Sequence, residues 1–166
     1  MSAASTETGT SALHPTLGAA VSGRRSKAIG KEGEREAKRL LLALGCQVAF
    51  TEVQGLAGDD MFILAPNGKW YSVEVKNTTS YNKDFLVQAK RQARERYDAI
   101  QELLSSPQKG LYEAMGLHTF DPDSYFVMWH PRNARIAMDS WSVYVSINGR
   151  VRCRHLDGEE GVWSLA

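Results

Sequence analysis

The stretch GDDMFILAPNGKWYSVEVKN, from Gly58 to Asn77, decides how the rest of the chain is interpreted. Two β-rich runs flank Asn67-Gly68, and this pattern predicts a hairpin because both central positions of a type I′ turn need φ > 0. Side chains alternate across a strand, so Glu74 and Lys76 share one face. The hairpin should therefore present acidic groups and a lysine together at one end.

The register of this hairpin leaves two acids as candidates. A strict two-residue turn would place Asp59 on the face of Glu74 and Lys76. An odd-length turn or a bulge would place Asp60 there instead. The residues alone leave both possibilities open.

Two carboxylates beside an ammonium group can hold a hard divalent cation and act on a phosphodiester. In this interpretation Asp60 and Glu74 bind the metal with the carbonyl of Val75, and Lys76 positions or deprotonates the attacking water. The spacing Asp…Glu-x-Lys is a weak pattern alone. It gains weight because Glu74 and Lys76 lie in an apolar strand and Glu34 lies on the helix before it.

Length and composition indicate one domain with a sizeable core. The chain has 166 residues, of which 43% are hydrophobic. Its net charge of +1 does not by itself indicate that it binds nucleic acid. Residues 1–22, rich in small polar residues, are predicted to be a disordered tail, and residues 23–166 a single domain. Cys46 and Cys153 have no metal-type spacing and favour a reduced intracellular protein. No apolar run approaches a membrane span, so the expected setting is the cytoplasm of a bacterium or its phage.

A first helix is predicted from Lys31 to Leu44, since Ala37, Leu41 and their apolar neighbours keep helical spacing and Gly45 follows as a stop. Glu34 falls on the edge of that stripe. It is either an ordinary first-turn acid, favoured by the helix dipole or paired with Lys38, or an inward carboxylate that needs a cation. The basic run before this helix is either a solvated entry or a phosphate-contacting arm; it comprises Arg24, Arg25, Lys27 and Lys31.

A long helix is predicted over Asp84–Leu104, capped by Asn82. Its cations lie around the rest of its surface and are either solvated or follow phosphates; they are Lys90, Arg91, Arg94 and Arg96. Residues 46–53, 125–129, 141–147 and 151–155 are predicted strands, with a short helical turn in 107–117 and a hairpin turn at 148–149. His130 is a single histidine at the end of a predicted strand, and we interpret it as structural rather than catalytic.

These features together resemble the PD-(D/E)XK nuclease superfamily, and most closely its small phage and bacterial nucleases of the Holliday-junction-resolvase type. The resemblance covers about residues 30–97 and is carried by four segments: Gly33-Glu34-Arg35-Glu36-Ala37, Gly45, Asp60-Met61-Phe62-Ile63-Leu64 and Val73-Glu74-Val75-Lys76. It implies an α/β fold, a restriction-endonuclease-like mixed β-sheet core flanked by helices. It also selects Asp60, an acid followed directly by apolar residues, over Asp59.

The resemblance implies a catalytic set, which is Glu34, Asp60, Glu74, Lys76 and Gln88. Glu34 would support the metal or its water in preference to Glu36, and Gln88 falls where many members carry a glutamine. The expected cofactor is Mg²⁺, with Mn²⁺ as a substitute. DNA is the expected partner, contacted by the basic run before the first helix and by Lys90, Arg91 and Arg94. Members of the resolvase type work as homodimers, because two symmetric cuts need two sites.

Four functions remain open on these grounds. The leading one is a metal-dependent endonuclease that acts on four-way junctions. A second keeps the site but cuts linear duplex or single-stranded DNA, as in restriction or repair. A third is a non-catalytic DNA-binding module, and a fourth is an unrelated α/β domain with the same acids on its surface.

Overall fold

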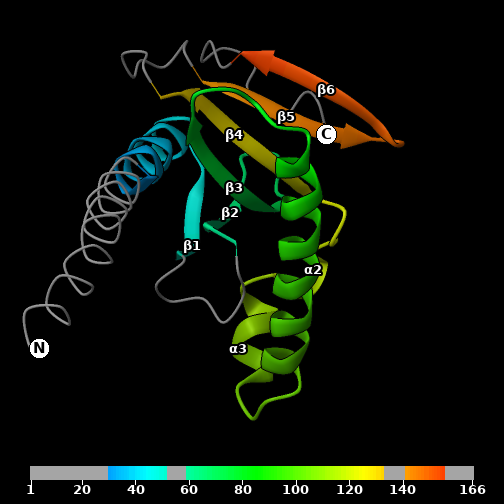
Figure 1. Ribbon diagram of the computed structural model, residues 1–166. Coiled ribbons are helices and arrows are strands. Elements are labelled where there is room, and N and C mark those ends of the chain that lie inside the picture. Colours follow the sequence, from blue (N-terminus) through cyan, green and yellow to red (C-terminus); the bar gives the residue numbers. More distant parts are fainter. Residues whose placement is uncertain (1–29, 52–58, 133–140, 156–166) are drawn as a thin grey trace, which may run out of the picture.

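Six strands form one mixed sheet in which neighbours in sequence are also neighbours in space (Figure 1). The computed structural model describes residues 30–51, 59–132 and 141–155. Only β3 and β4 pair in parallel; the other neighbours are antiparallel. The strands are β1 (Gln47–Thr51), β2 (Met61–Leu64), β3 (Trp70–Thr78), β4 (Tyr125–Pro131), β5 (Ser142–Ile147) and β6 (Arg150–His155).

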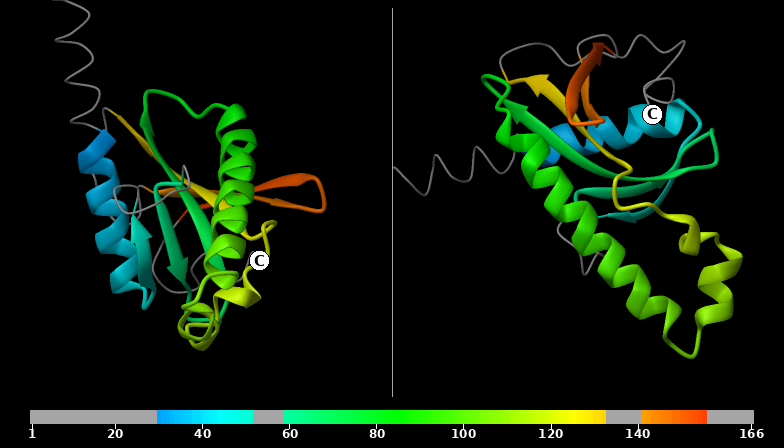
Figure 2. Two further views of the ribbon diagram at one scale, coloured as in Figure 1. Left: turned by 90° about the horizontal axis from the view of Figure 1, so that it is seen from below. Right: turned by 90° about the vertical axis from the view of Figure 1, so that its right-hand side faces the viewer.

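Helices cover both faces of this sheet (Figure 2). An N-terminal helix, described over residues 30–43, lies on one face, and α2 (Asp84–Leu104) lies on the other. α2 is the crossover that two parallel strands require, and it joins β3 to β4. The predicted bounds of α2 are confirmed, but its N-cap is Lys83 and not the predicted Asn82. The side chain of Asn82 accepts the Asp84 N–H at 2.9 Å in the turn that leads into the helix.

The two faces of the sheet have separate apolar clusters. Met61, Val73 and Phe126 belong to the cluster on the side of the N-terminal helix, whereas Phe62 and Val127 pack on the side of α2. This explains why Met61–Leu64 is a continuous apolar run, since a strand buried on both faces has no polar side. The predicted α/β class, a mixed sheet flanked by helices and consistent with a restriction-endonuclease-like core, is confirmed.

The turn of the central hairpin differs from the predicted two-residue turn. The Ala65 N–H donates to the Lys69 carbonyl at 2.9 Å, so the loop has three residues, and Gly68 (φ 82°) takes the left-handed conformation. A type I turn followed by such a glycine is the usual three-residue solution. The odd length pairs Met61 with Val73, and continuing this register would place Asp60 opposite Glu74. The second hairpin has the predicted two-residue turn, with φ 50° at Asn148 and 76° at Gly149.

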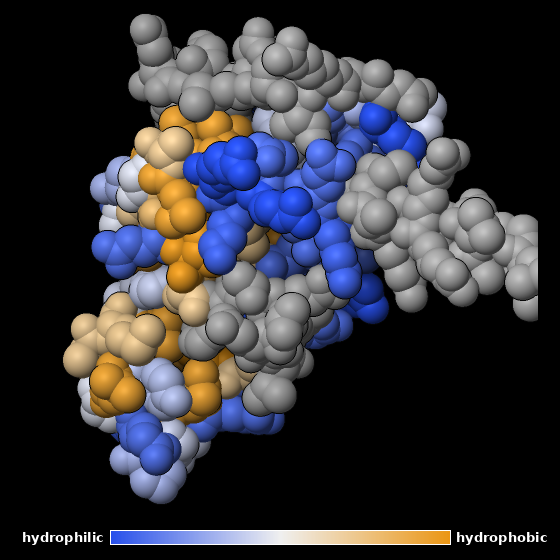
Figure 3. All heavy atoms as spheres, turned by 90° about the vertical axis from the view of Figure 1, so that its left-hand side faces the viewer, coloured by the Kyte–Doolittle hydropathy of each residue, from blue (hydrophilic) through white to orange (hydrophobic). Residues whose placement is uncertain are grey.

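The connection between α2 and β4 is more helical than predicted. It contains α3 (Lys109–Ala114) and the short 3₁₀ helix η2 (Leu117–Thr119). The predicted N-terminal tail lies outside the described residues. Among the helices that the structure describes, none is long and apolar enough to cross a membrane. From the side of the N-terminal helix, hydrophilic residues occupy the middle of the surface and hydrophobic residues lie beside them (Figure 3).

Candidate functional site

The candidate site lies where β3 continues beyond the end of β2. β2 pairs with β3 only as far as Val73, while β4 accompanies β3 to Thr78. In place of a strand partner, Asp60 Oδ2 accepts the Val75 N–H at 2.7 Å. The N–H and C=O of one strand residue point to the same side. The Val75 carbonyl therefore also faces the side that β2 has left, as the predicted metal-binding role requires.

Glu74 and Lys76 project from β3 on the face covered by α2. Lys76 Nζ lies 3.0 Å from Glu74 Oε1 and 5.4 Å from the centre of the Phe85 ring. Glu74 is only 4% exposed, whereas 22% of the Lys76 side chain reaches solvent. The ammonium group is thus held beside a buried carboxylate while it keeps access to the surface.

The second oxygen of Glu74 has no hydrogen-bond partner among the described residues. Glu74 Oε2 is buried, and so is Oε1 of Gln92 on α2, which likewise has no partner there. Burial raises the pKa of Glu74, and interactions with Lys76, Asp60 and Gln92 offset this only in part. A buried polar atom left unsatisfied is costly. This pair of oxygens therefore suits a cation or a water molecule.

Asp59 and Asp60 have different partners although they are adjacent. Arg96 of α2 forms a two-pronged ion pair with Asp59, at 2.7 Å from Nη2 to Oδ1 and 3.1 Å from Nε to Oδ2. Ser72 Oγ also donates to Asp59 Oδ2 at 3.1 Å, and the whole group is buried. Asp59 therefore has a structural role, while Asp60 faces β3 at Val75 and interacts with Glu74.

The predicted position of Arg96 on the basic surface of α2 is wrong, because its side chain is 3% exposed. Helical periodicity offered the missing signal. Gln92, Arg96 and Ile100 are four residues apart and lie on the buried side of α2.

The N-terminal helix approaches this end of β3 through Gly33. A Cβ atom at Gly33 would lie 3.1 Å from Cβ of Asn77, so glycine permits the close approach. Glu34 follows directly and is half-buried, and so is Glu36, so burial leaves both interpretations of Glu34 open. Glu36 forms an ion pair with the exposed Arg39 at 3.3 Å.

The glutamine of the site is Gln92 rather than the predicted Gln88. Gln88 is half-buried one helical turn earlier, whereas Gln92 is 6% exposed and interacts with Glu74. Gln88 and Gln92 are one turn apart and lie on the same side of the helix, so the sequence does not distinguish them. Only the position of α2 along the sheet decides between them.

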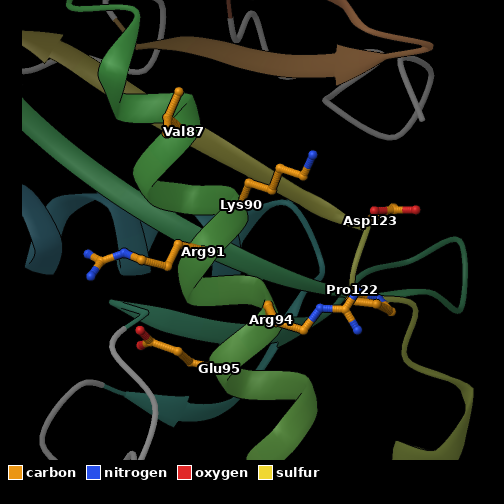
Figure 4. Close-up of a pocket in the computed structure, with 7 residues that line it drawn as sticks. All are labelled: Val87, Lys90, Arg91, Arg94, Glu95, Pro122 and Asp123. Atoms are coloured by element: carbon orange, nitrogen blue, oxygen red, sulfur yellow. The ribbon is translucent and has the colours of Figure 1, made fainter.

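Of the cations predicted to contact DNA, the structure describes Lys31 and the three on α2. Lys90, Arg91 and Arg94 are all exposed on α2. Lys90, Arg91 and Arg94 all line a hollow of about 390 Å³, into which Asp123 also faces. The Lys90 side chain projects toward Asp123, while the Arg91 side chain extends to the other side of the helix (Figure 4). Lys31 is exposed at the start of the N-terminal helix, and Arg24, Arg25 and Lys27 lie outside the described residues.

The residues of the site fit a hard divalent cation. Among the described residues, no group of three His, Cys, Asp or Glu side chains is placed to hold a metal. Mg²⁺ does not need one, since it is usually held by one or two carboxylates and keeps several waters. Asp60, Glu74 and the Val75 carbonyl supply that donor set, and the buried Glu74 Oε2 suits such a cation. His130 is excluded from the site because it packs against Trp141 in the core on the other face.

Comparisons with protein-family models, with curated proteins and with solved structures found no match. The function must therefore be argued from the geometry of the site.

Proposed function

We propose that this protein is a Mg²⁺-dependent endonuclease that hydrolyses phosphodiester bonds of DNA, with branched DNA such as four-way junctions as its substrate. One observation carries the proposal. Two carboxylates, Asp60 and Glu74, meet where β3 continues beyond the end of β2. One buried Glu74 oxygen has no partner there among the described residues, and Lys76 Nζ lies 3.0 Å from the other. Structural acids are normally fully paired, as Asp59 is.

Each residue has a role that follows from its position. Bound Mg²⁺ would supply a more acidic water and neutralise the charge that builds up on the phosphate. Asp60, Glu74 and the Val75 carbonyl would hold the ion, and the partly exposed Lys76 would orient the attacking water or the scissile phosphate. Gln92 would hold a water through its amide, and Glu34 would support the site from the N-terminal helix.

The preference for branched DNA and a homodimeric state come from the resemblance to resolvases. Symmetric cutting of two strands needs two sites, which a two-fold pair of chains supplies. DNA as the substrate would also place the enzyme in the cytoplasm.

The test is cleavage of a labelled four-way junction with and without Mg²⁺. Wild type should cut only with Mg²⁺ or Mn²⁺, and Lys76→Ala and Asp60→Ala should each lower the rate at least 100-fold, since each removes a group acting on the reacting phosphate. Glu113→Gln, a surface variant on α3, is the matched control and should cut like wild type.

Other substrates decide between the related functions. Equal amounts of linear duplex and single-stranded DNA are assayed beside the junction. Cutting of linear duplex alone, at one sequence, would replace the resolvase function by a restriction-type one. If the protein bound DNA but cut none of these substrates with any metal ion present, it would be a DNA-binding module and not an enzyme.

A further inference from the structure

The exposed cations of α2 lie on two sides of the helix. Lys90 and Arg94 are four residues apart and share one side. Arg91 comes three residues after Gln88 and directly before Gln92, and at about 100° per residue these three share the other side. Arg91 also borders the hollow that Lys90 and Arg94 line, but its side chain extends away from Lys90 (Figure 4). The side of α2 that carries Gln88, Arg91 and Gln92 is named here the site side.

The site side of α2 faces the candidate site. Gln92 is 6% exposed and interacts with Glu74. Near the start of the same helix, the ring of Phe85 lies 5.4 Å from Lys76 Nζ. Between Phe85 and Gln92, α2 therefore runs along both site residues of β3. Arg91 belongs to this part of the helix, at the exposed rim of the site side.

Arg91 has no carboxylate partner among the described residues. Its side chain is exposed, and none of the ion pairs between described residues includes it. Arg96, by contrast, is buried in its pair with Asp59. Glu95, the next charged residue on the site side, lies one turn further from Lys76. The end of the site side that adjoins Lys76 therefore carries a positive charge, which favours an anionic ligand.

We propose that Arg91 binds a backbone phosphate of the substrate strand close to the bond that is cleaved. Arg91 follows Phe85, the neighbour of Lys76, by six residues, which is a rise of about 9 Å along the helix. One strand carries a phosphate about every 3.4 Å along a duplex, so the bound phosphate lies within about three nucleotides of the scissile one. Arginine suits this role because its guanidinium donates two parallel hydrogen bonds to phosphate. The inference rests on the proposed function, since it takes DNA as the substrate and Glu74 and Lys76 as the place of cleavage.

The first test is the salt dependence of DNA binding by the full-length chain in EDTA, where no cutting occurs. Affinity for a labelled four-way junction is measured from about 50 to 200 mM KCl for wild type and for Arg91→Gln. Loss of one phosphate contact lowers the slope of log K against log salt by about 0.9. The affinity advantage of wild type over Arg91→Gln should therefore shrink about 3.5-fold over this range. Arg91→Lys, which retains the charge, should keep most of the slope.

Two neighbours on the same helix provide matched controls. Lys90→Gln and Arg94→Gln each remove one positive charge from an exposed position on the other side of α2. Both should keep the slope of wild type. An unchanged slope in Arg91→Gln would overturn the proposal. So would equal losses of slope in all three variants, because these would show a general effect of the charge of the helix.

The second test locates the phosphate. Single phosphates of the junction are replaced by uncharged methylphosphonates, and binding is measured again in EDTA. In wild type and in Lys90→Gln, one replacement within about three nucleotides of the cut should weaken binding. The same replacement should have no further effect in Arg91→Gln, because the contact is already lost. Equal effects of every replacement on wild type and Arg91→Gln would overturn the proposal.

The outcome is separable from that of the proposed function. If wild type cuts no DNA, the replacements are scanned along the whole junction. One phosphate whose effect depends on Arg91 would then keep the contact and remove the nuclease. A wild type that cuts DNA while Arg91→Gln binds with an unchanged slope would keep the nuclease and overturn this inference. A wild type that binds no DNA would also overturn it.

Discussion

Asp59 shows how strongly one buried partner can determine what an acid does. Its two oxygens are occupied by Arg96 and Ser72, so the site is left to Asp60. The guanidinium of Arg96 also lies 5.4 Å from the centre of the Phe62 ring, which fixes it between β2 and α2. We infer that this ion pair holds the chain at Asp59 and so directs Asp60 toward Val75.

Arg96→Met should be strongly destabilising because it leaves Asp59 buried without its cation. Removing one partner of a buried pair costs about 3–5 kcal/mol. Urea denaturation should show this loss, whereas Arg91→Met, at an exposed position of the same helix, should change stability by less than about 0.5 kcal/mol. The double variant Asp59→Leu/Arg96→Met should recover much of the loss, since an apolar pair can replace a buried ion pair. A similar cost for both single variants would refute the inferred role of Arg96.

Such a pair is hard to predict from sequence. Asp59 and Arg96 are separated by 37 residues, and Arg96 is one of four cations in a short segment of α2. Their charges resemble those of solvated residues until α2 is placed on the sheet. The sequence does not distinguish Gln92 from Gln88 for the same reason, since the distance of each glutamine from Glu74 depends on how far along β3 the helix lies.

The elements themselves were largely predictable because each has its own local signal. α2 keeps an apolar stripe for its full length, and Asn148-Gly149 forms the expected turn. The turn at Asn67-Gly68 was wrong by one residue because Pro66 starts a type I turn, with the Gly68 N–H bonded to the Ala65 carbonyl. That single residue decides which acid the hairpin aligns with Glu74.

The contact between the N-terminal helix and β3 gives a prediction for Gly33. An alanine Cβ there would lie 3.1 Å from Cβ of Asn77, close to rigid backbone, so the helix must move away from the site. Overpacking of this kind typically costs about 1–3 kcal/mol, against about 1 kcal/mol gained from the better helix propensity of alanine. Gly33→Ala should therefore be neutral to destabilising by about 2 kcal/mol in urea denaturation, and it should lower cleavage because Glu34 moves with the helix.

Gly30→Ala is the control within the same helix. A Cβ at Gly30 would meet no atom within 4 Å, so this variant should be neutral or slightly stabilising and should cleave normally. If Gly33→Ala stabilised the protein as much as Gly30→Ala and left cleavage unchanged, the close approach would have no functional consequence.

On the scale of the whole molecule, the proposed metal site would make stability depend on pH and on metal together. Burial raises the pKa of Glu74 above its ordinary value. A raised carboxyl pKa means that the folded chain holds its proton more tightly than the unfolded chain. The stabilising contribution is complete below the unfolded pKa and is lost as pH rises through the folded pKa. Ionised Glu74 therefore costs stability in the metal-free protein at neutral pH.

Glu74→Gln should consequently melt at a higher temperature than wild type when both are in EDTA at neutral pH, and this advantage should shrink as the pH falls below the raised pKa. Mg²⁺ should reverse the order. A ligand at 100 times its Kd stabilises by about 2.7 kcal/mol, and only wild type retains the carboxylate that is proposed to bind it. Thermal unfolding across pH, with and without Mg²⁺, measures both effects.

Glu113→Gln provides the comparison for this last prediction, since Glu113 is a half-exposed acid in a surface pair with Lys109. The melting temperature of Glu113→Gln should equal that of wild type in every condition. A shift that occurs only in Glu74→Gln therefore arises from the site and not from the loss of a negative charge in general. Stabilisation of Glu74→Gln by Mg²⁺ to the same extent as wild type would place the ion elsewhere. A lower melting temperature in EDTA would instead mean that the ion pair with Lys76 outweighs the cost of burying Glu74, and the carboxylate would then be structural like that of Asp59.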